Sequence, residues 1–379
     1  MLEGHRMKEK MKIPVAEPDL GPEEVKNVLT ALREGWISSK GSFINQFEEN
    51  FASYIGTSYG VATANGTAAL HLALASLGFG KDDEIITNNL TFVSPVNSIL
   101  YIGATPVLVD SNAEYWGLDT SKIEERIDNH TKAILVVHLY GHPCDMDAIM
   151  KLSRKYDLKV IEDCAEAHGA KYKGKRVGTF GDISCFSFYG NKVITTGEGG
   201  MCLTNDNEIY EKVKIFRDHG MTEAKRYWHD VVGFNYRMTN LQAAIGLAQL
   251  KKIEKFINIR RKNASIYKSE LMNLPGITFQ PEMSWANITY WLYSILINEE
   301  ELGIDRNVFS KSLTNLGIDT RNFFYPVNIM PPYRKFGGSR LFPVSERLSN
   351  SGLNLPSSTK LEKEDIIYVT DSIKEILNV

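Results

Sequence analysis

The stretch "KAILVVHLYGHPCDMDAIMKLSRKYDLKVIEDC", residues 132–164, decides the fold class. It begins with an apolar run of strand length, continues through residues 146–157, which are predicted as a helix, and ends in a second apolar run at residues 159–164. Two apolar strands joined by a helix indicate a βαβ unit. The strands of such a unit are parallel, and helices cover both faces of their sheet.

The same alternation continues toward the amino terminus. The predicted strands there are residues 59–64, 83–88 and 105–110, and the predicted helices are residues 21–32, 42–56, 66–78, 95–103 and 120–128. Gly56 and Gly78 stop two of these helices, and Pro22 opens the first. The chain is therefore predicted to be an α/β protein with a mainly parallel sheet.

The character of the sequence changes after about residue 250. A long helical stretch leads into a region that mixes strands with helices, which indicates a small α+β domain. The chain has 379 residues, too many for one compact core. We therefore predict an N-terminal arm at residues 1–20 (residues 1–6 could derive from a cloning vector), a large domain at residues 21–255 and a small C-terminal domain at residues 256–379.

Composition excludes several classes of function. The net charge is −3, and no basic stripe favours nucleic acid. The amino terminus has no apolar core like that of a secretory signal, and the longest apolar runs are too short to span a bilayer. The four cysteines have no CxxC spacing, so we expect buried, reduced thiols and no metal site. We expect a cytoplasmic protein with neither nucleic acid nor membrane as a partner.

One lysine stands apart from other charges. Lys192 lies within "FSFYGNKVITTGEGG", residues 186–200, between an apolar run predicted as a strand and a glycine-rich loop. An amine that is desolvated can lose its proton and act as a nucleophile. Ser187 could contact the phosphate of the same ligand. The alternative is a loop lysine that reaches solvent past glycines that only form turns.

Two further candidates follow predicted strands. Gly66 and Thr67 open a helix, where free backbone N–H groups suit a phosphate. Asn65 or Thr67 could instead be only an N-cap. Phe92 could cover the face of a flat heterocycle, although a phenylalanine in the core is the simpler interpretation.

The segment "VIEDCAEAHG" places a carboxylate at the tip of a buried strand. Asp163 needs a partner there, because burying an unpaired charge is costly. It could hold a proton on a heterocyclic nitrogen, form a salt bridge or cap a helix. Metal binding by Asp163, Glu166 and His168 is a further alternative, which no second cluster of ligands supports. Taken together, a phosphate cradle, an aromatic cover, an acid and an amine match the requirements of pyridoxal phosphate.

With these residues in place, the chain resembles the DegT/DnrJ/EryC1/StrS family of sugar aminotransferases. The resemblance covers nearly the whole chain, from "WISSKGSFINQFE" through "NGTAALHLAL", "EDCAEAHGA" and "FSFYGNKVITTGEGG" to "RNFFYPVNIMPPY". It implies the aspartate-aminotransferase-like fold of type I pyridoxal-phosphate enzymes. This fold has a large domain with a mainly parallel seven-stranded sheet and a smaller C-terminal α+β domain.

The resemblance also implies roles for single residues. Lys192 would carry the cofactor through a Schiff base, Asp163 would pair with the pyridine nitrogen, and Phe92 would stack on the ring. Gly66, Thr67 and Ser187 would hold the phosphate, and Glu166 stands near the 3-hydroxyl where the family often has glutamine. Asn235 looks like the residue that reaches the phosphate of a neighbouring subunit, which implies a homodimer with shared active sites. Candidate substrate contacts, each of which could equally be a packing or surface residue, are Trp36, His229, Arg321, Tyr325 and Asn328.

The reaction type follows from the retained lysine. Related sugar dehydratases have histidine at the position of Lys192, so the resemblance implies transamination. The segments around His229 and Tyr325 look most like members that convert GDP-4-keto-6-deoxy-D-mannose, with glutamate as amino donor, into GDP-perosamine for the lipopolysaccharide O-antigen. Asn328 replaces a histidine that relatives usually have. The alternatives are a UDP- or dTDP-linked keto sugar as substrate, or a non-catalytic regulator with this fold.

Overall fold

A seven-stranded sheet forms the centre of the molecule in the computed structural model, which describes residues 13–222, 225 and 227–378. The strand order is β1-β9-β8-β5-β4-β2-β3, and only β9 runs against its neighbours. The bounds are β1 (Tyr59–Thr63), β2 (Glu84–Asn88), β3 (Thr105–Val109), β4 (Thr131–Val137), β5 (Lys159–Asp163), β8 (Ile183–Ser187) and β9 (Gly200–Thr204). The sheet is thus mainly parallel, as the alternating pattern predicts.

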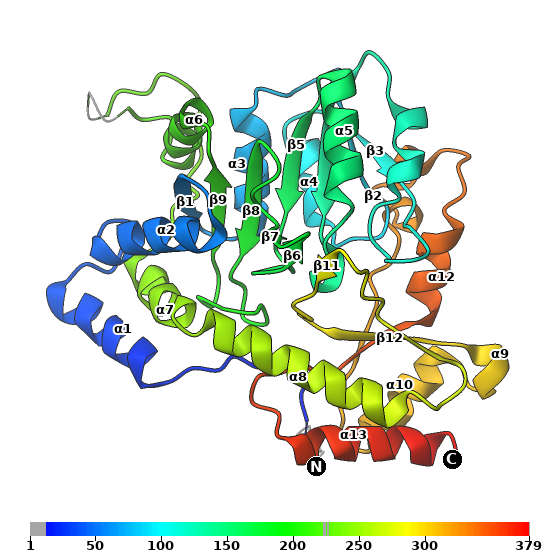
Figure 1. Cartoon of the computed structure of the whole chain (residues 1–379). Coiled ribbons are helices and arrows are strands. Elements are labelled where there is room, and N and C mark those ends of the chain that lie inside the picture. Colours follow the sequence, from blue (N-terminus) through cyan, green and yellow to red (C-terminus); the bar gives the residue numbers. More distant parts are fainter. Residues whose placement is uncertain (1–12, 223–224, 226, 379) are drawn as a thin grey trace, which may run out of the picture.

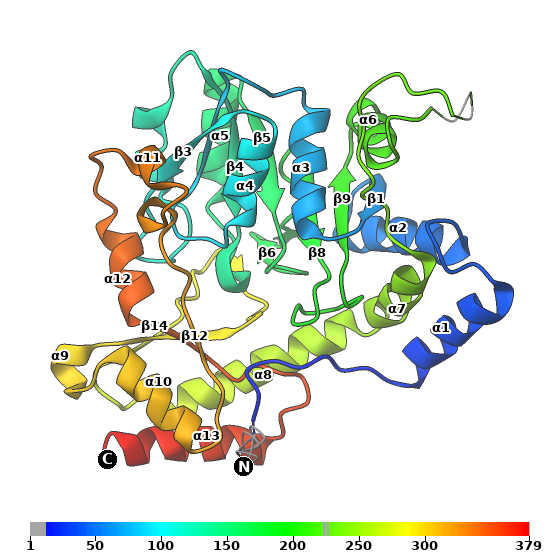
Figure 2. The same ribbon diagram turned by 180° about the vertical axis from the view of Figure 1, so that it is seen from behind.

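Helices cover both faces of this sheet. In Figure 1, α5 lies in front of the strands, whereas the reverse view in Figure 2 shows α3 and α4 in front. Apolar side chains of the central strands point alternately into two separate cores, one under each layer of helices. The covering helices are α2 (Ser42–Ile55), α5 (Met146–Tyr156) and α7 (Asn240–Leu250) on one face, and α3 (Gly66–Ser76), α4 (Ser94–Tyr101) and α6 (Asn207–Arg217) on the other. Helix α1 (Pro22–Glu34) packs on α7.

The chain after the long helix α8 (Ile253–Leu271) forms a second, antiparallel sheet. Its strand order is β10-β12-β14-β13. It has its own apolar core, which α8, α10 and α13 close (Figure 1). The bounds are β10 (Ile277–Phe279), β12 (Tyr293–Ile297), β13 (Arg321–Asn322), β14 (Gly352–Leu355), α9 (Glu299–Leu302), α10 (Arg306–Asn315), α11 (Arg334–Gly337), α12 (Pro343–Ser351) and α13 (Lys363–Ile376). The predicted α/β fold with a smaller second unit is therefore confirmed. The division at residue 255 falls within α8 and stays a prediction.

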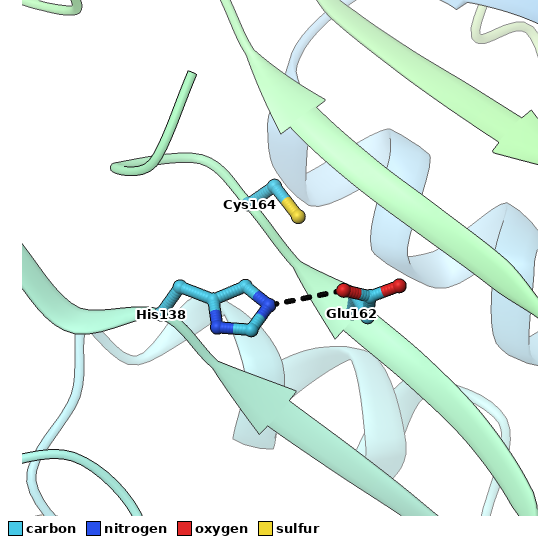
Figure 3. A group of neighbouring side chains, drawn as sticks. All are labelled: His138, Glu162 and Cys164. Carbon is cyan, nitrogen blue, oxygen red and sulfur yellow. Dashed lines mark hydrogen bonds and ion pairs between the residues drawn. The ribbon is translucent and has the colours of Figure 1, made fainter. Parts of the chain in front are cut away.

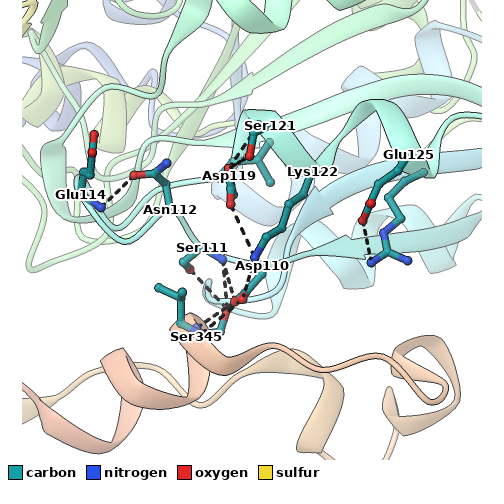
Figure 4. A network of polar contacts seen from close by, with 12 residues as sticks. Asp110, Ser111, Asn112, Glu114, Asp119, Ser121, Lys122, Glu125 and Ser345 are labelled. Atoms are coloured by element: carbon teal, nitrogen blue, oxygen red, sulfur yellow. Dashed lines mark hydrogen bonds and ion pairs between the residues drawn. The ribbon is translucent and has the colours of Figure 1, made fainter.

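The segment after β13 packs against the large sheet, where hydrogen bonds join the start of α12 to the end of β3. Asp110 follows β3 and accepts hydrogen bonds from the backbone N–H (2.8 Å) and hydroxyl (2.7 Å) of Ser345, at the start of α12 (Figure 4). The Asp110 carboxylate also accepts the N–H of Ser111 at 2.8 Å, and Lys122 Nζ lies 3.4 Å from its other oxygen. Burial alone would raise the pKa of Asp110, but these hydrogen bonds hold it below its usual value.

Some local predictions were wrong. The helix predicted at residues 120–128 is a pair of 3-10 turns, η1 (Thr120–Lys122) and η2 (Glu124–Arg126). Asp119 and Asp128 each accept hydrogen bonds from backbone N–H groups two residues further along the chain, and such contacts favour turns over a continuous helix. The predicted helical stretch at residues 241–274 is interrupted between α7 and α8.

Several small elements were not anticipated. They include α6, α12 and a three-stranded sheet of β6 (Lys171–Tyr172), β7 (Lys175–Arg176) and β11 (Ala286–Asn287). Two further 3-10 turns are η3 (Leu139–Gly141) and η4 (Val327–Ile329). No helix in the described part of the chain is long and apolar enough to cross a membrane. Residues 1–6, which could derive from a cloning vector, lie outside the described residues.

Candidate active site

The predicted cofactor residues other than Asn235 meet in one cavity of about 780 Å³ at the carboxyl ends of the parallel strands. Loops that follow β1, β2, β5 and β8 supply its walls, and residues of the second unit close one side. The sequence-predicted residues that line it are Gly66, Thr67, Phe92, Asp163, Glu166, Ser187, Lys192 and Arg321. Positions far apart in the sequence are thus brought to a single site.

The predicted phosphate cradle lies in the cavity wall, where α3 begins beside the end of β8. Asn65 caps the helix, because its Oδ1 accepts the N–H of Ala68 at 2.8 Å. The first N–H groups, of Gly66 and Thr67, have no intrahelical acceptor, as at the start of any helix. A Cβ on Gly66 would lie 2.8 Å from the Cβ of Ser187, so the close approach of these two residues requires glycine. The cap by Asn65 therefore leaves these two N–H groups open to a ligand, and the phosphate site stays a prediction.

Asp163 ends β5 and is buried in the wall of the cavity. Its Oδ1 accepts the N–H of Ala165 at 3.0 Å, and its Oδ2 accepts no hydrogen bond from any residue that the structure describes. Burial raises the pKa of Asp163, which the nearby charge of Lys192 partly offsets. A cationic group placed against Oδ2 would stabilise the carboxylate.

Lys192 follows β8 and directs its amine into the same cavity. Its side chain is 11% exposed, and Nζ lies 3.8 Å from Oε1 of Glu166. Burial lowers the pKa of Lys192, although Glu166 and Asp163 oppose this effect. The Nζ atom also lies 3.7 Å from the ring centroid of Trp291. The amine is therefore close to two acids and largely removed from water, as a nucleophilic lysine requires.

Glu166 is a buried acid with one fixed hydrogen bond. Its Oε2 accepts the backbone N–H of Tyr140 at 2.8 Å. Tyr140 adopts a left-handed backbone with a φ of 51°, and this conformation belongs to the turn that directs its N–H at the acid. Burial raises the pKa of Glu166 to about 7, and Lys192 moderates the rise. Glu166 can therefore hold or release a proton near neutral pH.

Two residues at the mouth of the cavity are exposed. Phe92 is 54% exposed, and its ring centroid lies 5.8 Å from that of Phe324. It is therefore not the core phenylalanine of the alternative interpretation. Arg321, in β13 of the second unit, offers a guanidinium to the same space.

The remaining predicted residues do not line this cavity. Asn235 is exposed and accepts hydrogen bonds from Arg237. Asn328 exchanges two hydrogen bonds with Asn89, from its own N–H to Oδ1 (3.1 Å) and from Asn89 Nδ2 to its Oδ1 (2.8 Å). The others with exposed side chains are Trp36, His229 and Tyr325. Their roles in binding stay predictions.

A metal site receives little support. Within the described residues, one group of three candidate ligands lies close enough together, namely His138, Glu162 and Cys164 (Figure 3). Glu162 already accepts three backbone N–H groups and faces His138 Nε2 at 3.2 Å. The other ring nitrogen of His138 accepts the N–H of Cys144 at 3.1 Å. Both ring nitrogens are therefore engaged by protein groups, and the contact between Glu162 and His138 joins β5 to the residue that follows β4.

Asp163, Glu166 and His168, the metal alternative from the sequence, are not among the groups of described residues whose ligand atoms lie within 4.8 Å of one another. His168 is packed against the rings of Phe51 and Phe186, and burial lowers its pKa to about 3. Its imidazole is a neutral core group and does not line the cavity.

Similarity to known proteins decides the family. The sequence profile of the DegT/DnrJ/EryC1/StrS aminotransferase family matches residues 18–374. The chain belongs to this family. It is 48% identical to the GDP-perosamine synthase of Escherichia coli O157:H7 over 96% of this chain and 98% of that protein. It is 44% identical to the GDP-perosamine synthase of Caulobacter vibrioides, over 97% and 98% of the two chains.

Solved structures agree with this assignment. An aminotransferase of pseudoaminic acid biosynthesis from Helicobacter pylori superimposes with a TM-score of 0.91 at 29% identity, and 97% of this chain and 99% of that chain are covered. An aminotransferase from Psychrobacter cryohalolentis gives a TM-score of 0.91 at 30% identity, over 96% and 98% of the two chains. The fold is therefore that of the aspartate-aminotransferase-like enzymes, and the protein is a pyridoxal-phosphate-dependent aminotransferase.

The residues present fit this cofactor. The cradle at Gly66 suits its phosphate, the unpaired oxygen of Asp163 suits a ring nitrogen that carries a proton, and the amine of Lys192 shares the cavity with both. Sequence reasoning missed other residues that shape the site. Ser94 contacts the Thr67 hydroxyl at 2.7 Å, and Tyr140 and Trp291 contact Glu166 and Lys192. They come from distant segments, and no local motif marks them.

Proposed function

We propose that this enzyme transfers the amino group of L-glutamate to carbon 4 of GDP-4-keto-6-deoxy-D-mannose and so makes GDP-perosamine. The observation that carries the proposal is the full-length similarity to three proteins named GDP-perosamine synthase, at 48%, 44% and 41% identity. We further propose that the reaction takes place in the cytoplasm and supplies an amino sugar for the lipopolysaccharide O-antigen.

In this proposal the two ends of the cofactor are held by different elements. The N–H groups of Gly66 and Thr67 and the hydroxyl of Ser187 bind the phosphate. Asp163 holds a proton at the ring nitrogen, where its Oδ2 gains the hydrogen-bond donor that it lacks among the described residues. Phe92 covers one ring face. When bound, pyridoxal phosphate supplies an electron sink for negative charge at the reacting carbon.

Lys192 carries the proton transfers. Its burial favours the neutral amine, so Nζ can take a proton from the α-carbon of glutamate and deliver one to the carbon of the sugar that is aminated. Glu166 stands 3.8 Å from this amine and can exchange a proton near neutral pH. Arg321 is positioned to bind the carboxylate of glutamate or the diphosphate of the sugar nucleotide.

A comparison of substrates tests which nucleotide the sugar must carry. Purified enzyme with glutamate is assayed with GDP-, UDP- and dTDP-linked 4-keto-6-deoxy sugars, and the amino sugar formed is quantified by mass spectrometry. The proposal requires the highest kcat/KM with the GDP-linked sugar. A preference for the dTDP-linked sugar would favour the second candidate, because a dTDP-3-amino-3,6-dideoxy-alpha-D-galactopyranose transaminase is 37% identical over 90% of this chain. No turnover of any of them, with no change in cofactor absorbance on adding glutamate, would favour a non-catalytic protein.

We also propose a homodimer in which Asn235 completes the phosphate site of the neighbouring subunit. Asn235 is exposed and lies outside its own cavity, whereas the adjacent Tyr236 lines that cavity. Lys192→Ala and Asn235→Ala proteins, each of low activity, are coexpressed with different tags, and the mixed dimers are purified. Each mixed dimer would hold one intact site, so about half of wild-type activity is expected. Failure to regain activity in the mixed dimer would contradict a shared site.

A further inference from the structure

Trp291 contacts both the amine of Lys192 and the backbone next to it. It precedes β12, far from Lys192 in the sequence, yet it is buried in the wall of the same cavity. Its indole face lies under the amine, with 3.7 Å between Nζ and the ring centroid. Its Nε1 donates a hydrogen bond of 2.8 Å to the carbonyl oxygen of Asn191. One side chain therefore holds both the tip of the lysine and the backbone that precedes it.

Other residues contact both the backbone and the ring of Trp291. Arg260, buried in α8, donates from Nη1 to the carbonyl oxygen of Trp291 at 2.8 Å and to that of Ser357 at 2.7 Å. The ring of Tyr140 stacks against the indole at a centroid distance of 6.2 Å and an interplanar angle of 19°. The backbone N–H of Tyr140 in turn positions Glu166. The tryptophan is thus a fixed support and not a loose neighbour.

The amine has few other restraints. Its ion pair with Glu166 is long, at 3.8 Å, and Nζ makes no hydrogen bond with any of the residues described. A lysine side chain has several freely rotating bonds, so an amine without a support would occupy many positions. The indole face blocks one side of Nζ and can accept the N–H groups of the neutral amine as well as those of an ammonium group, so it limits the positions that the amine can take.

We propose that Trp291 is a positioning residue that keeps the amine of Lys192 aimed at the cofactor site. The inference rests on the proposed role of Lys192 as the residue that carries the cofactor. Placing a reacting group in advance accelerates a reaction without changing how tightly the other reactant binds elsewhere in the site. Trp291 should therefore govern how fast the lysine joins the cofactor and leave the phosphate cradle and Asp163 unaffected.

Two probes separate these effects in protein from which the cofactor has been removed. Pyridoxal phosphate condenses with the lysine amine and releases one water, and the rate of this condensation is followed by absorbance. Pyridoxine phosphate has an alcohol in place of the aldehyde, cannot condense, and reports only on binding by the cradle and the acid. Lys192→Ala serves as the baseline. If that variant still gains the absorbance of attached cofactor, the role of Lys192 is wrong, independently of Trp291.

The variants are Trp291→Leu, which removes the aromatic face, and Trp291→Phe, which keeps a face but removes the N–H to Asn191. Trp285→Phe is the matched control, because Trp285 also packs against aromatic rings, those of Tyr115 and Tyr172, but is not in contact with Lys192. We expect condensation to slow by about tenfold in Trp291→Leu and about threefold in Trp291→Phe, with the Kd of pyridoxine phosphate unchanged. The control should match wild type in both measurements.

Either of two results would overturn the proposal. Condensation at the wild-type rate in Trp291→Leu would mean that the amine finds its place without the indole. An equal loss in pyridoxine phosphate affinity would mean that Trp291 only maintains the shape of the site. Should Trp291→Leu not fold, the same criteria apply to Trp291→Phe. Neither probe involves a sugar nucleotide, so the outcome is independent of whether the GDP-linked substrate is right.

Discussion

Replacing Glu166 by glutamine should remove a pH dependence of stability. In the unfolded chain this carboxyl has its ordinary pKa of 4.5, and burial in the folded protein raises it to about 7. Between these values the folded protein binds a proton that the unfolded chain has released, so the wild-type protein loses stability as pH rises. At about 1.4 kcal/mol per pH unit, the total loss is about 3 kcal/mol. Above about pH 7 the loss is complete and stability stops falling from this cause.

The assay compares urea unfolding of the cofactor-free wild-type and Glu166→Gln proteins between about pH 5 and pH 8. Glutamine can still accept the N–H of Tyr140, and it does not titrate. As pH rises, the free energy of unfolding of the variant should therefore increase relative to that of wild type by most of the total loss of about 3 kcal/mol expected for wild type. Glu49→Gln is the control for removing one carboxylate elsewhere, because Glu49 is exposed. In Lys192→Met, the carboxyl has lost its cationic neighbour and the dependence should extend to higher pH. Parallel curves for wild type and Glu166→Gln would refute the reasoning.

Two other substitutions test the cradle and the fastening of α12. Gly66→Ala would place a Cβ 2.8 Å from that of Ser187, so we expect the affinity for pyridoxine phosphate to fall by at least about tenfold, measured by titration. An unchanged affinity would mean that the phosphate binds elsewhere. Asp110→Ala leaves three N–H groups, those of Ser111, Val344 and Ser345, and the Ser345 hydroxyl without their acceptor, and we expect a loss of about 3 kcal/mol in unfolding free energy at neutral pH. Because the folded-state pKa of Asp110 is depressed, the part of this difference that depends on its charge should shrink as pH falls from the unfolded-state pKa through the folded-state pKa, and a difference that does not change with pH would contradict the assignment.

The sequence predicted the central sheet well because its strands are short, apolar and separated by helices with clear stops. It brought most of the candidate cofactor residues to one cavity for a related reason. Gly66, Asp163 and Ser187 all stand where a strand ends, and the ends of parallel strands meet at one edge of a sheet. Chemistry and position could therefore be inferred together, without knowledge of side-chain contacts.

Other features depend on contacts that no local pattern encodes. In the sequence, Trp291 looks like any apolar residue of a buried segment. Only the path of the chain after α8 places it against Lys192. The pairing of Asn328 with Asn89 is also non-local, so the sequence alone suggested a substrate contact for Asn328. The antiparallel strand β9 was missed because its glycine-rich start was interpreted as part of a loop.

The central claim is that one amine, that of Lys192, carries the cofactor. Enzyme saturated with pyridoxal phosphate is treated with borohydride, which reduces the bond between amine and cofactor to a stable one, and the digested protein is mapped by mass spectrometry. The account predicts the added mass on the peptide that contains Lys192 and on no other lysine. Stoichiometric labelling of a different lysine, with Lys192 unmodified, would contradict it.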